Sequence, residues 1–123
     1  MAQCFRLGAL LLVAGLLLPV GLPGYRVANL HLTFIGGFTI ILFTVSTRVI
    51  LGHSGHSYLF QKRLRFLIAS LALLVLAMLA RVSADFILPE RNTHLVYAAL
   101  MWILAAVVWG SALAPKLEIR GSD

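Results

Sequence analysis

The chain has 123 residues, of which 61% are hydrophobic and 11% are charged. Soluble domains carry roughly 25% charged residues, so this composition excludes a soluble domain and places the chain in a bilayer. The formal charge of +6 does not indicate a nucleic-acid partner, because the basic residues stand at the ends of apolar segments, where they usually set topology.

Four segments of the chain approach or reach the roughly 17–25 apolar residues that a spanning helix requires. These segments cover residues 7–22, 28–51, 64–81 and 95–114. We therefore predict an all-α fold, a multi-pass bundle of four transmembrane helices that forms a single membrane domain over residues 1–123. The lipid bilayer is then its first partner.

The first segment permits two interpretations. Arg6 before a leucine-rich core is typical of a secretory signal, but no A-x-A-like cleavage site follows before Tyr25, which favours a retained anchor. Cys4 is the only cysteine, so an intramolecular disulfide, a CxxC metal site and a CxxCH haem attachment are all excluded. Any bound haem is therefore non-covalent.

The second segment concentrates small and polar residues on one face. At about 100° per residue, roughly a third of the helix circumference collects Thr33, Gly36, Gly37, Thr44, Thr47 and Arg48. Small residues allow helices to approach closely, and Thr hydroxyls can bond back to their own helix. Packing alone and packing around a ligand both remain open for this face.

The connection after the second segment contains the motif GHSGH. Its two glycines argue against a helix that continues through His53 and His56. Residues 57–65 can form a short interfacial helix that holds Tyr58 and Phe60 at headgroup level.

The third segment ends in Arg81, which is placed to pair with Asp85 four residues later. Pro89 interrupts any helix that continues, and Asn92 or Thr93 can cap the start of the fourth segment. The fourth segment then carries a stripe of large and small side chains at spacings of three and four, namely His94, Ala98, Trp102, Ala105, Trp109 and Ala112. A planar ring can lie against such a stripe, and so can the side chains of a neighbouring helix.

Basic residues indicate how the chain crosses the membrane, since cytoplasmic loops retain positive charge. Four spans place most of them on one side, namely Arg6, Lys62, Arg63, Arg65, Lys116 and Arg120. We therefore expect both termini in the cytoplasm.

Two arginines are candidates for cofactor binding. An ionisable group near the end of a spanning helix is either a topology anchor whose long stem reaches the interface, or a cation held for an anionic group. Arg48 lies inside the second segment and Arg81 ends the third. Each can bind a carboxylate such as a haem propionate through its guanidinium fork.

The four histidines divide into two pairs, one at each face of the membrane. His31 and His94 open the second and fourth helices, where they can provide two axial ligands for one haem near the outer face. His53 and His56 can bind a second metal or haem near the inner face, with ligands from elsewhere. The alternative for each is an interfacial hydrogen-bonding residue. No hydrolytic motif appears in the sequence.

The stretch HLTFIGGFTIILFTVSTRVILGHSGH, residues 31–56, resembles the NnrS family of bacterial inner-membrane proteins associated with nitric oxide. The ARV motif, the Trp-containing fourth segment and the tail APKLEIRG are similar to that family as well. The resemblance implies that the chain matches the C-terminal four-helix portion of longer members. Because it begins with Met and a basic flank, we expect it to be complete and to form a homo-oligomer or to dock against a larger membrane partner.

This resemblance implies binding of b-type haem and of copper, and a role in tolerance of nitric oxide through sensing, sequestration or electron transfer. It carries over to His31, Arg48, Gly52, His53 and Gly55, whereas His56 stands where the family usually has Arg. Whether the protein is an enzyme stays undecided. The alternative function is that of a structural or assembly subunit without metal, packed against a larger complex.

Overall fold

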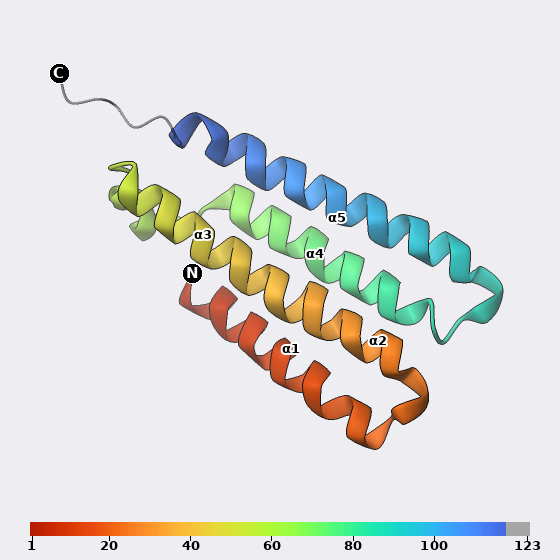
Figure 1. Ribbon diagram of the computed structural model, residues 1–123. Helices are drawn as coiled ribbons and strands as arrows, with labels where there is room; N and C mark the ends of the chain where they lie inside the picture. Colours follow the sequence, from red (N-terminus) through yellow and green to blue (C-terminus); the bar gives the residue numbers. More distant parts are fainter. Residues whose placement is uncertain (118–123) are drawn as a thin grey trace.

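The computed structural model describes residues 1–117, which form helices connected by short turns (Figure 1). The long helices are α1 (Ala2–Gly21), α3 (Ile40–His53), α4 (Arg65–Ser83) and α5 (Arg91–Leu113). Two further elements precede α3 without a break, the α-helix α2 (Arg26–His31) and the π-helix η2 (Leu32–Thr39). Short 3-10 turns complete the chain: η1 (Pro23–Tyr25), η3 (Ser57–Gln61), η4 (Leu88–Glu90) and η5 (Ala114–Lys116). Arg120, part of the predicted basic tail, lies outside the described residues.

Four helical stretches are long and apolar enough to cross a membrane, which confirms the predicted all-α transmembrane bundle. They run over Ala2–Gly21, Pro23–His53, Arg65–Ser83 and Leu88–Lys116. The second is longer than predicted, because the helix continues through Gly52 to His53 and the chain turns only at Gly55, whose φ is 75°. The glycines were predicted to prevent a helix through His53 and His56. This was wrong for His53, since a single Gly inside a helix costs only about 1 kcal/mol, whereas His56 lies outside the helix as predicted.

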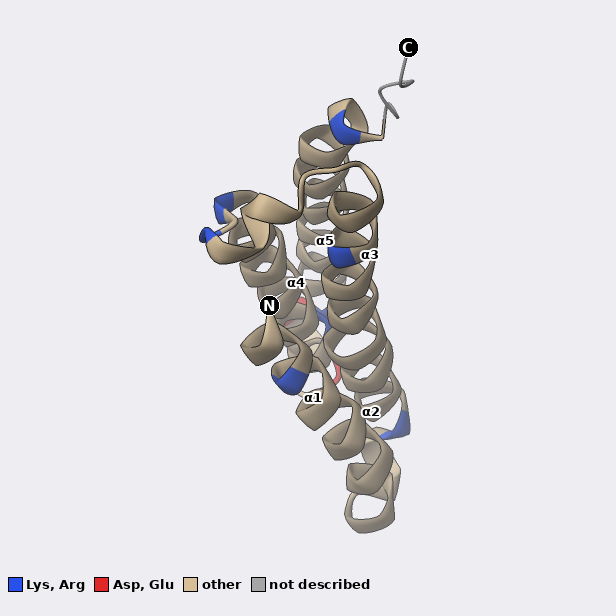
Figure 2. Ribbon diagram, turned by 90° about the vertical axis from the view of Figure 1, so that its left-hand side faces the viewer, with Lys and Arg blue, Asp and Glu red and all other residues tan. Residues whose placement is uncertain are grey.

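The four spans lie antiparallel and side by side (Figure 1). We call the end that carries the N-terminus, η3 and η5 the basic end, and the end that carries η1 and η4 the opposite end. Within residues 1–117, the basic end has no acidic side chain and carries Arg6, Arg48, Lys62, Arg63, Arg65 and Lys116. Figure 2 shows blue segments near the visible C-terminus and on the loop beside α4.

The small and polar face of the second span packs against α1 and α4. A Cβ at Gly37 would meet the backbone Cα of Leu12 in α1 at 2.8 Å, so only glycine permits this approach. A Cβ at Gly36 would instead meet the side-chain sulfur of Met78 in α4. Phe34, which points away from this face, is 55% exposed. The glycines and threonines of this face therefore contact other helices as predicted, whereas Arg48, predicted on the same face, is exposed.

Polar groups inside the spans find partners on their own helix. The Thr44 hydroxyl donates to the carbonyl of Ile40 at 2.8 Å, and the Thr47 hydroxyl donates to the carbonyl of Phe43 at 2.6 Å. Every buried side-chain nitrogen or oxygen in the described part of the chain has a hydrogen-bond partner. This is what a bilayer demands, because lipid tails offer no hydrogen bonds.

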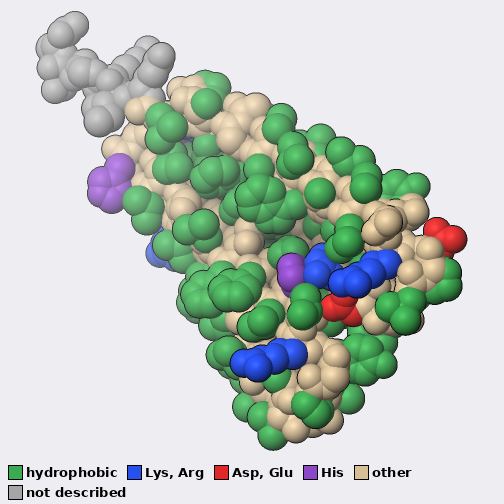
Figure 3. Space-filling model, turned by 45° about the vertical axis from the view of Figure 1, so that its right-hand side comes forward, with side chains coloured by type: hydrophobic (Ala, Val, Ile, Leu, Met, Phe, Trp, Pro, Cys, Tyr) green, Lys and Arg blue, Asp and Glu red, His purple; other side chains and the backbone are tan. Residues whose placement is uncertain are grey.

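The outer surface is apolar over most of its area. Figure 3 shows hydrophobic side chains across one face, with basic and histidine side chains toward both ends and acidic side chains at the end away from the grey residues. Large residues such as Val20 and Leu10 are exposed. In water such a surface promotes aggregation, whereas in a bilayer it contacts the lipid.

Candidate functional site

The opposite end of the bundle has a groove between η2 and α5. We call it the His31 groove; its volume is about 430 Å³ and it is lined by His31, Ile35, Arg81, Leu95, Ala98, Ala99, Trp102 and Ile103. Cofactor sites typically have volumes of about 300–1,000 Å³ and apolar walls with a few polar groups. This groove has a volume and walls of that kind, and it is open on one side of the bundle.

The His31 imidazole is held in one orientation. Its Nδ1 lies 2.8 Å from the carbonyl oxygen of Val27, one turn earlier in the helix. A carbonyl oxygen only accepts, so Nδ1 carries the proton and Nε2 keeps its lone pair. Metal-binding histidines commonly have this arrangement, because the second hydrogen bond fixes the tautomer and the ring.

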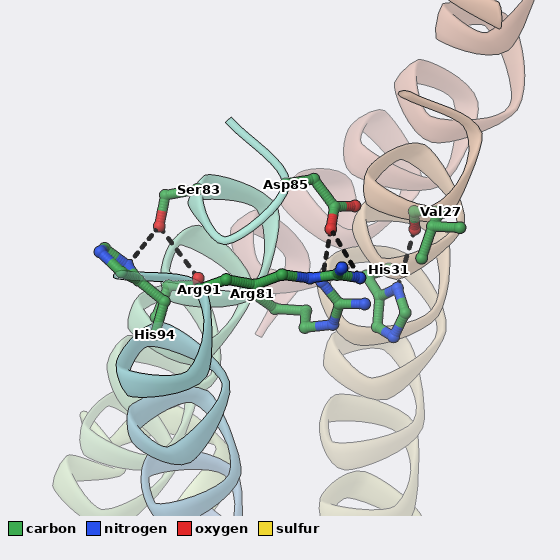
Figure 4. A network of polar contacts seen from close by, with 8 residues as sticks. Val27, His31, Arg81, Ser83, Asp85, Arg91 and His94 are labelled. Atoms are coloured by element: carbon green, nitrogen blue, oxygen red, sulfur yellow. Dashed lines mark hydrogen bonds and ion pairs between the residues drawn. The ribbon is translucent and has the colours of Figure 1, made fainter. Parts of the chain in front are cut away.

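Arg81 is fixed beside His31 by a carboxylate. Its guanidinium lies 3.3 Å from Asp85, which confirms the pairing predicted from their spacing, and Arg91 approaches the same carboxylate at 3.9 Å. The side chains of Arg81 and Asp85 are only 13% and 12% exposed. One carboxylate thus faces two guanidinium groups, and the cluster keeps one positive charge next to His31 (Figure 4).

The structure does not bring His94 into the His31 groove. Its Nδ1 donates to the Ser83 hydroxyl at 2.8 Å, since the Ser83 proton is already directed to the Ala80 carbonyl at 2.9 Å. Figure 4 shows His94 on the far side of Arg81 from His31. Its neighbour Leu95 lines the groove in its place.

The stripe on α5 serves two purposes along its length. Ala98 and Trp102 line the groove, which is the role of a cofactor wall. Trp109 instead packs inside the bundle, where its ring stacks on Phe43 at 4.7 Å and its Nε1 donates to Thr47 Oγ1 at 2.9 Å. The packing interpretation is therefore confirmed for Trp109, whereas a cofactor wall at Ala98 and Trp102 stays a prediction.

A second groove lies at the basic end. We call it the Arg48 groove; its volume is about 350 Å³ and it is lined by Arg48, Val49, Gly52, His53 and Phe60. His53 repeats the arrangement of His31, with Nδ1 3.0 Å from the carbonyl of Val49. The Arg48 guanidinium carbon lies 5.8 Å from the centroid of the Phe60 ring.

His56 is not part of this groove. It follows Gly55 and bonds to the Ser54 hydroxyl at 3.1 Å. Over residues 1–117, no three His, Cys, Asp or Glu side chains lie close enough to hold one metal ion. His53 and His56 therefore offer two separate imidazoles there and not a closed metal site.

The start of α5 differs from the sequence prediction in two respects. Helix α5 begins at Arg91 after Glu90, with no side-chain cap, so the prediction that Asn92 or Thr93 caps it was wrong. Pro89 lies in η4, directly before the helix, and its fixed φ starts the turn without a capping side chain. The approach of Arg91 to Asp85 was missed, because no regular spacing joins residues on either side of a turn.

Comparison with known proteins gives one match. No curated protein and no solved structure matches the chain. The family model described as NnrS protein matches residues 1–118, nearly the whole sequence. Four helices are long and apolar enough to cross a membrane, and the family model covers nearly the whole chain. The chain is therefore a membrane protein of the NnrS family, a family associated with nitric oxide.

Proposed function

We propose that this protein binds b-type haem in the His31 groove and acts in the cellular response to nitric oxide. One observation carries the proposal. The neutral His31 imidazole keeps the lone pair of Nε2 free at a groove whose charged lining residue is Arg81. The family association with nitric oxide supports the role.

The residues present fit such a group. Ala98 and Ala99 are small enough to let a planar ring approach α5, and Trp102 adds an aromatic wall. The Arg81 guanidinium offers donors to a propionate carboxylate, and Asp85 holds it in place. Because Cys4 is the only cysteine, the attachment is non-covalent.

The chain's own residues would hold the haem and orient it. When bound, haem iron supplies a position at which nitric oxide can coordinate. The Val27 carbonyl fixes the His31 ring, so His31 would hold the group through Nε2. Because Ser83 holds His94 outside the groove, His94 would not join His31 in binding the group.

Copper, the other metal that the family resemblance implies, does not fit the described residues. His53 lines the Arg48 groove, His56 is bonded to Ser54, and no third ligand joins them within the described part.

An optical spectrum of the purified protein tests the haem proposal. We expect a Soret band that is lost in His31→Ala and retained in His53→Ala, a matched control with the same local hydrogen bond at the other end. His94→Ala should also retain the band. A colourless wild-type protein from haem-replete cells, or a His31→Ala variant with an unchanged spectrum, would overturn the proposal. Loss of the band in His94→Ala would instead restore the two-histidine arrangement.

Nitric oxide added to the reduced protein should shift the Soret band, and the shift measures binding. Rapid consumption of nitric oxide by the isolated protein would make it an enzyme, whereas stoichiometric binding supports sensing or sequestration. The two outcomes separate the roles because only turnover consumes more than one equivalent.

We also propose that the basic end faces the cytoplasm of a bacterial cell and that the membrane is the inner membrane. The basic end carries most of the Lys and Arg residues outside the spans, and such residues are retained on the cytoplasmic side of a membrane. Cys4 in α1 is the only cysteine. It should resist a membrane-impermeant maleimide in intact spheroplasts and react after lysis; labelling before lysis would reverse the orientation.

A subunit role without metal is the second candidate. The flanking spans support it, because the apolar windows of the first and fourth spans are only 11% buried, against 39% and 33% for the inner two. Lipid, a second copy or a larger partner can cover them. A colourless preparation that co-purifies with one defined membrane protein would favour this candidate over haem binding.

A further inference from the structure

Arg48 is a charged side chain on the lipid-facing side of a spanning helix. It stands five residues before the end of α3 at His53, about 7.5 Å along the helix axis at 1.5 Å per residue. Its neighbours Val45 and Val49 are exposed, and so is Arg48 itself. A cation at this depth is costly unless its long stem reaches the interface, and an anion there stabilises it further.

The described part of the chain provides no such anion. Its two ion pairs both use Asp85, at the opposite end of the bundle. The basic end adds further cations, including Lys62, Arg63 and Arg65, and no carboxylate within residues 1–117. The anions that a bilayer offers at this level are the phosphates of its lipids.

The groove around Arg48 has the shape and chemistry for a headgroup. Phe60 folds over it from η3, with its ring centroid 5.8 Å from the guanidinium carbon. Gly52 has no side chain to fill the groove, and the nearest atom to a Cβ there would be Phe60 Cζ at 3.8 Å. The guanidinium can then bind two phosphate oxygens, while the Phe60 ring and Val49 offer apolar surface to the glycerol and acyl chains.

A second cation lies on the same loop. The Lys62 ammonium is 5.8 Å from the centroid of the Tyr58 ring, so the aromatic rings of η3 lie beside Arg48 of α3 and beside Lys62, which follows η3. We propose that the Arg48 groove binds the phosphate of an anionic membrane lipid. The site is distinct from the His31 groove, where the equivalent arginine is already paired with a carboxylate.

Native mass spectrometry of the full chain tests the site. The protein is released from micelles that contain equal amounts of phosphatidylglycerol and phosphatidylcholine, and the bound lipid is identified. We expect phosphatidylglycerol to be preferred, and the preference to fall about tenfold in Arg48→Gln, as loss of a charge-assisted hydrogen-bonded contact implies. Arg63→Gln is the matched control; it removes one positive charge of the same loop outside the groove and should keep most of the preference.

Two further variants separate the site from general surface charge. Arg48→Lys keeps the charge but loses the fork, and should retain only part of the preference. Gly52→Leu keeps Arg48 but fills the groove, and should lose the preference. Circular dichroism of all variants in phosphatidylcholine checks that they fold.

Other outcomes overturn the proposal. Equal binding of the two lipids by the wild type, or an equal loss in Arg48→Gln and Arg63→Gln, would leave only a diffuse basic surface. Displacement of phosphatidylglycerol by millimolar inorganic phosphate would assign the groove to free phosphate. The Soret band is measured separately, so failure here is distinguishable from failure of the haem proposal.

Discussion

The His31 groove and the Arg48 groove are built from the same local motif. In each, a histidine donates Nδ1–H to the carbonyl of a valine four residues earlier, and an arginine lines the same space. They differ in what surrounds the motif. Arg81 is largely buried against Asp85, whereas Arg48 is exposed and, within residues 1–117, has no carboxylate beside it.

The comparison shows that a local motif does not by itself determine chemistry. The His31 groove lies between spans, where α5 supplies small and aromatic walls. The Arg48 groove lies at the interface, between the end of one helix and a 3-10 turn. The first arrangement favours a planar cofactor, and the second favours a membrane lipid.

The largest effect is expected where α1 supports the His31 groove. A Cβ at Gly15 would lie 2.7 Å from the backbone nitrogen of Thr33 in η2, two residues after His31. Because backbone cannot move aside cheaply, Gly15→Ala should destabilise the protein by about 1–3 kcal/mol and lower its haem content. Thermal unfolding in detergent and the absorbance of the Soret band measure the two effects.

Gly21→Ala is the matched control for Gly15→Ala. It lies on the same helix, and nothing lies within 4 Å of its added Cβ. Both substitutions reduce the conformational freedom of the unfolded chain in the same way, so the difference between them isolates the contact with η2. Equal stability of the two variants would show that α1 does not press on the His31 groove.

Much of this architecture could be predicted from the sequence. Apolar length predicted the four spans, and the common face of Thr33, Gly36 and Gly37 predicted close helix contact, because helical periodicity determines which side chains share a face. The Arg81–Asp85 pair followed from a spacing of four.

The remaining features depend on tertiary structure. The π-helix η2 could not be predicted, because the hydrophobic pattern of its residues is equally compatible with an ordinary α-helix. The meeting of His31 and Arg81 in one groove joins residues from different spans. Only the packing of those spans determines whether two such residues face each other, so periodicity within either segment cannot predict it.

A smaller effect is expected when the charge cluster at the His31 groove is broken. Asp85→Asn leaves Arg81 and Arg91 without their shared carboxylate, and the side chain of Arg81 is only 13% exposed. We expect a loss of about 1–2 kcal/mol in the free energy of unfolding, measured by denaturant titration in detergent.

Glu90→Gln removes the same charge from an exposed neighbour that makes no ion pair among the described residues, and should change stability little. The lipid preference of the Arg48 groove should survive both substitutions. If Asp85→Asn altered that preference as strongly as Arg48→Gln, the two ends would not be independent sites.

The smallest effect concerns the contact that connects the two grooves. Thr47 precedes Arg48, and its hydroxyl accepts from Trp109 on α5, the helix that also walls the His31 groove. Thr47→Val leaves the Trp109 Nε1–H without its acceptor, and we expect a loss of about 1 kcal/mol, within the range measured for hydrogen bonds between membrane helices. Thr44→Val is the matched control, because the Thr44 hydroxyl bonds only to its own helix. A double-mutant cycle with Trp109→Phe isolates the pair, and a coupling near zero would contradict the assignment.

If the grooves are separate sites on one rigid bundle, Thr47→Val lowers stability while the Soret band and the lipid preference stay unchanged, since the Phe43–Trp109 stack continues to hold α5 against α3. A simultaneous shift of both readouts would instead make this hydrogen bond a link through which the two ends communicate.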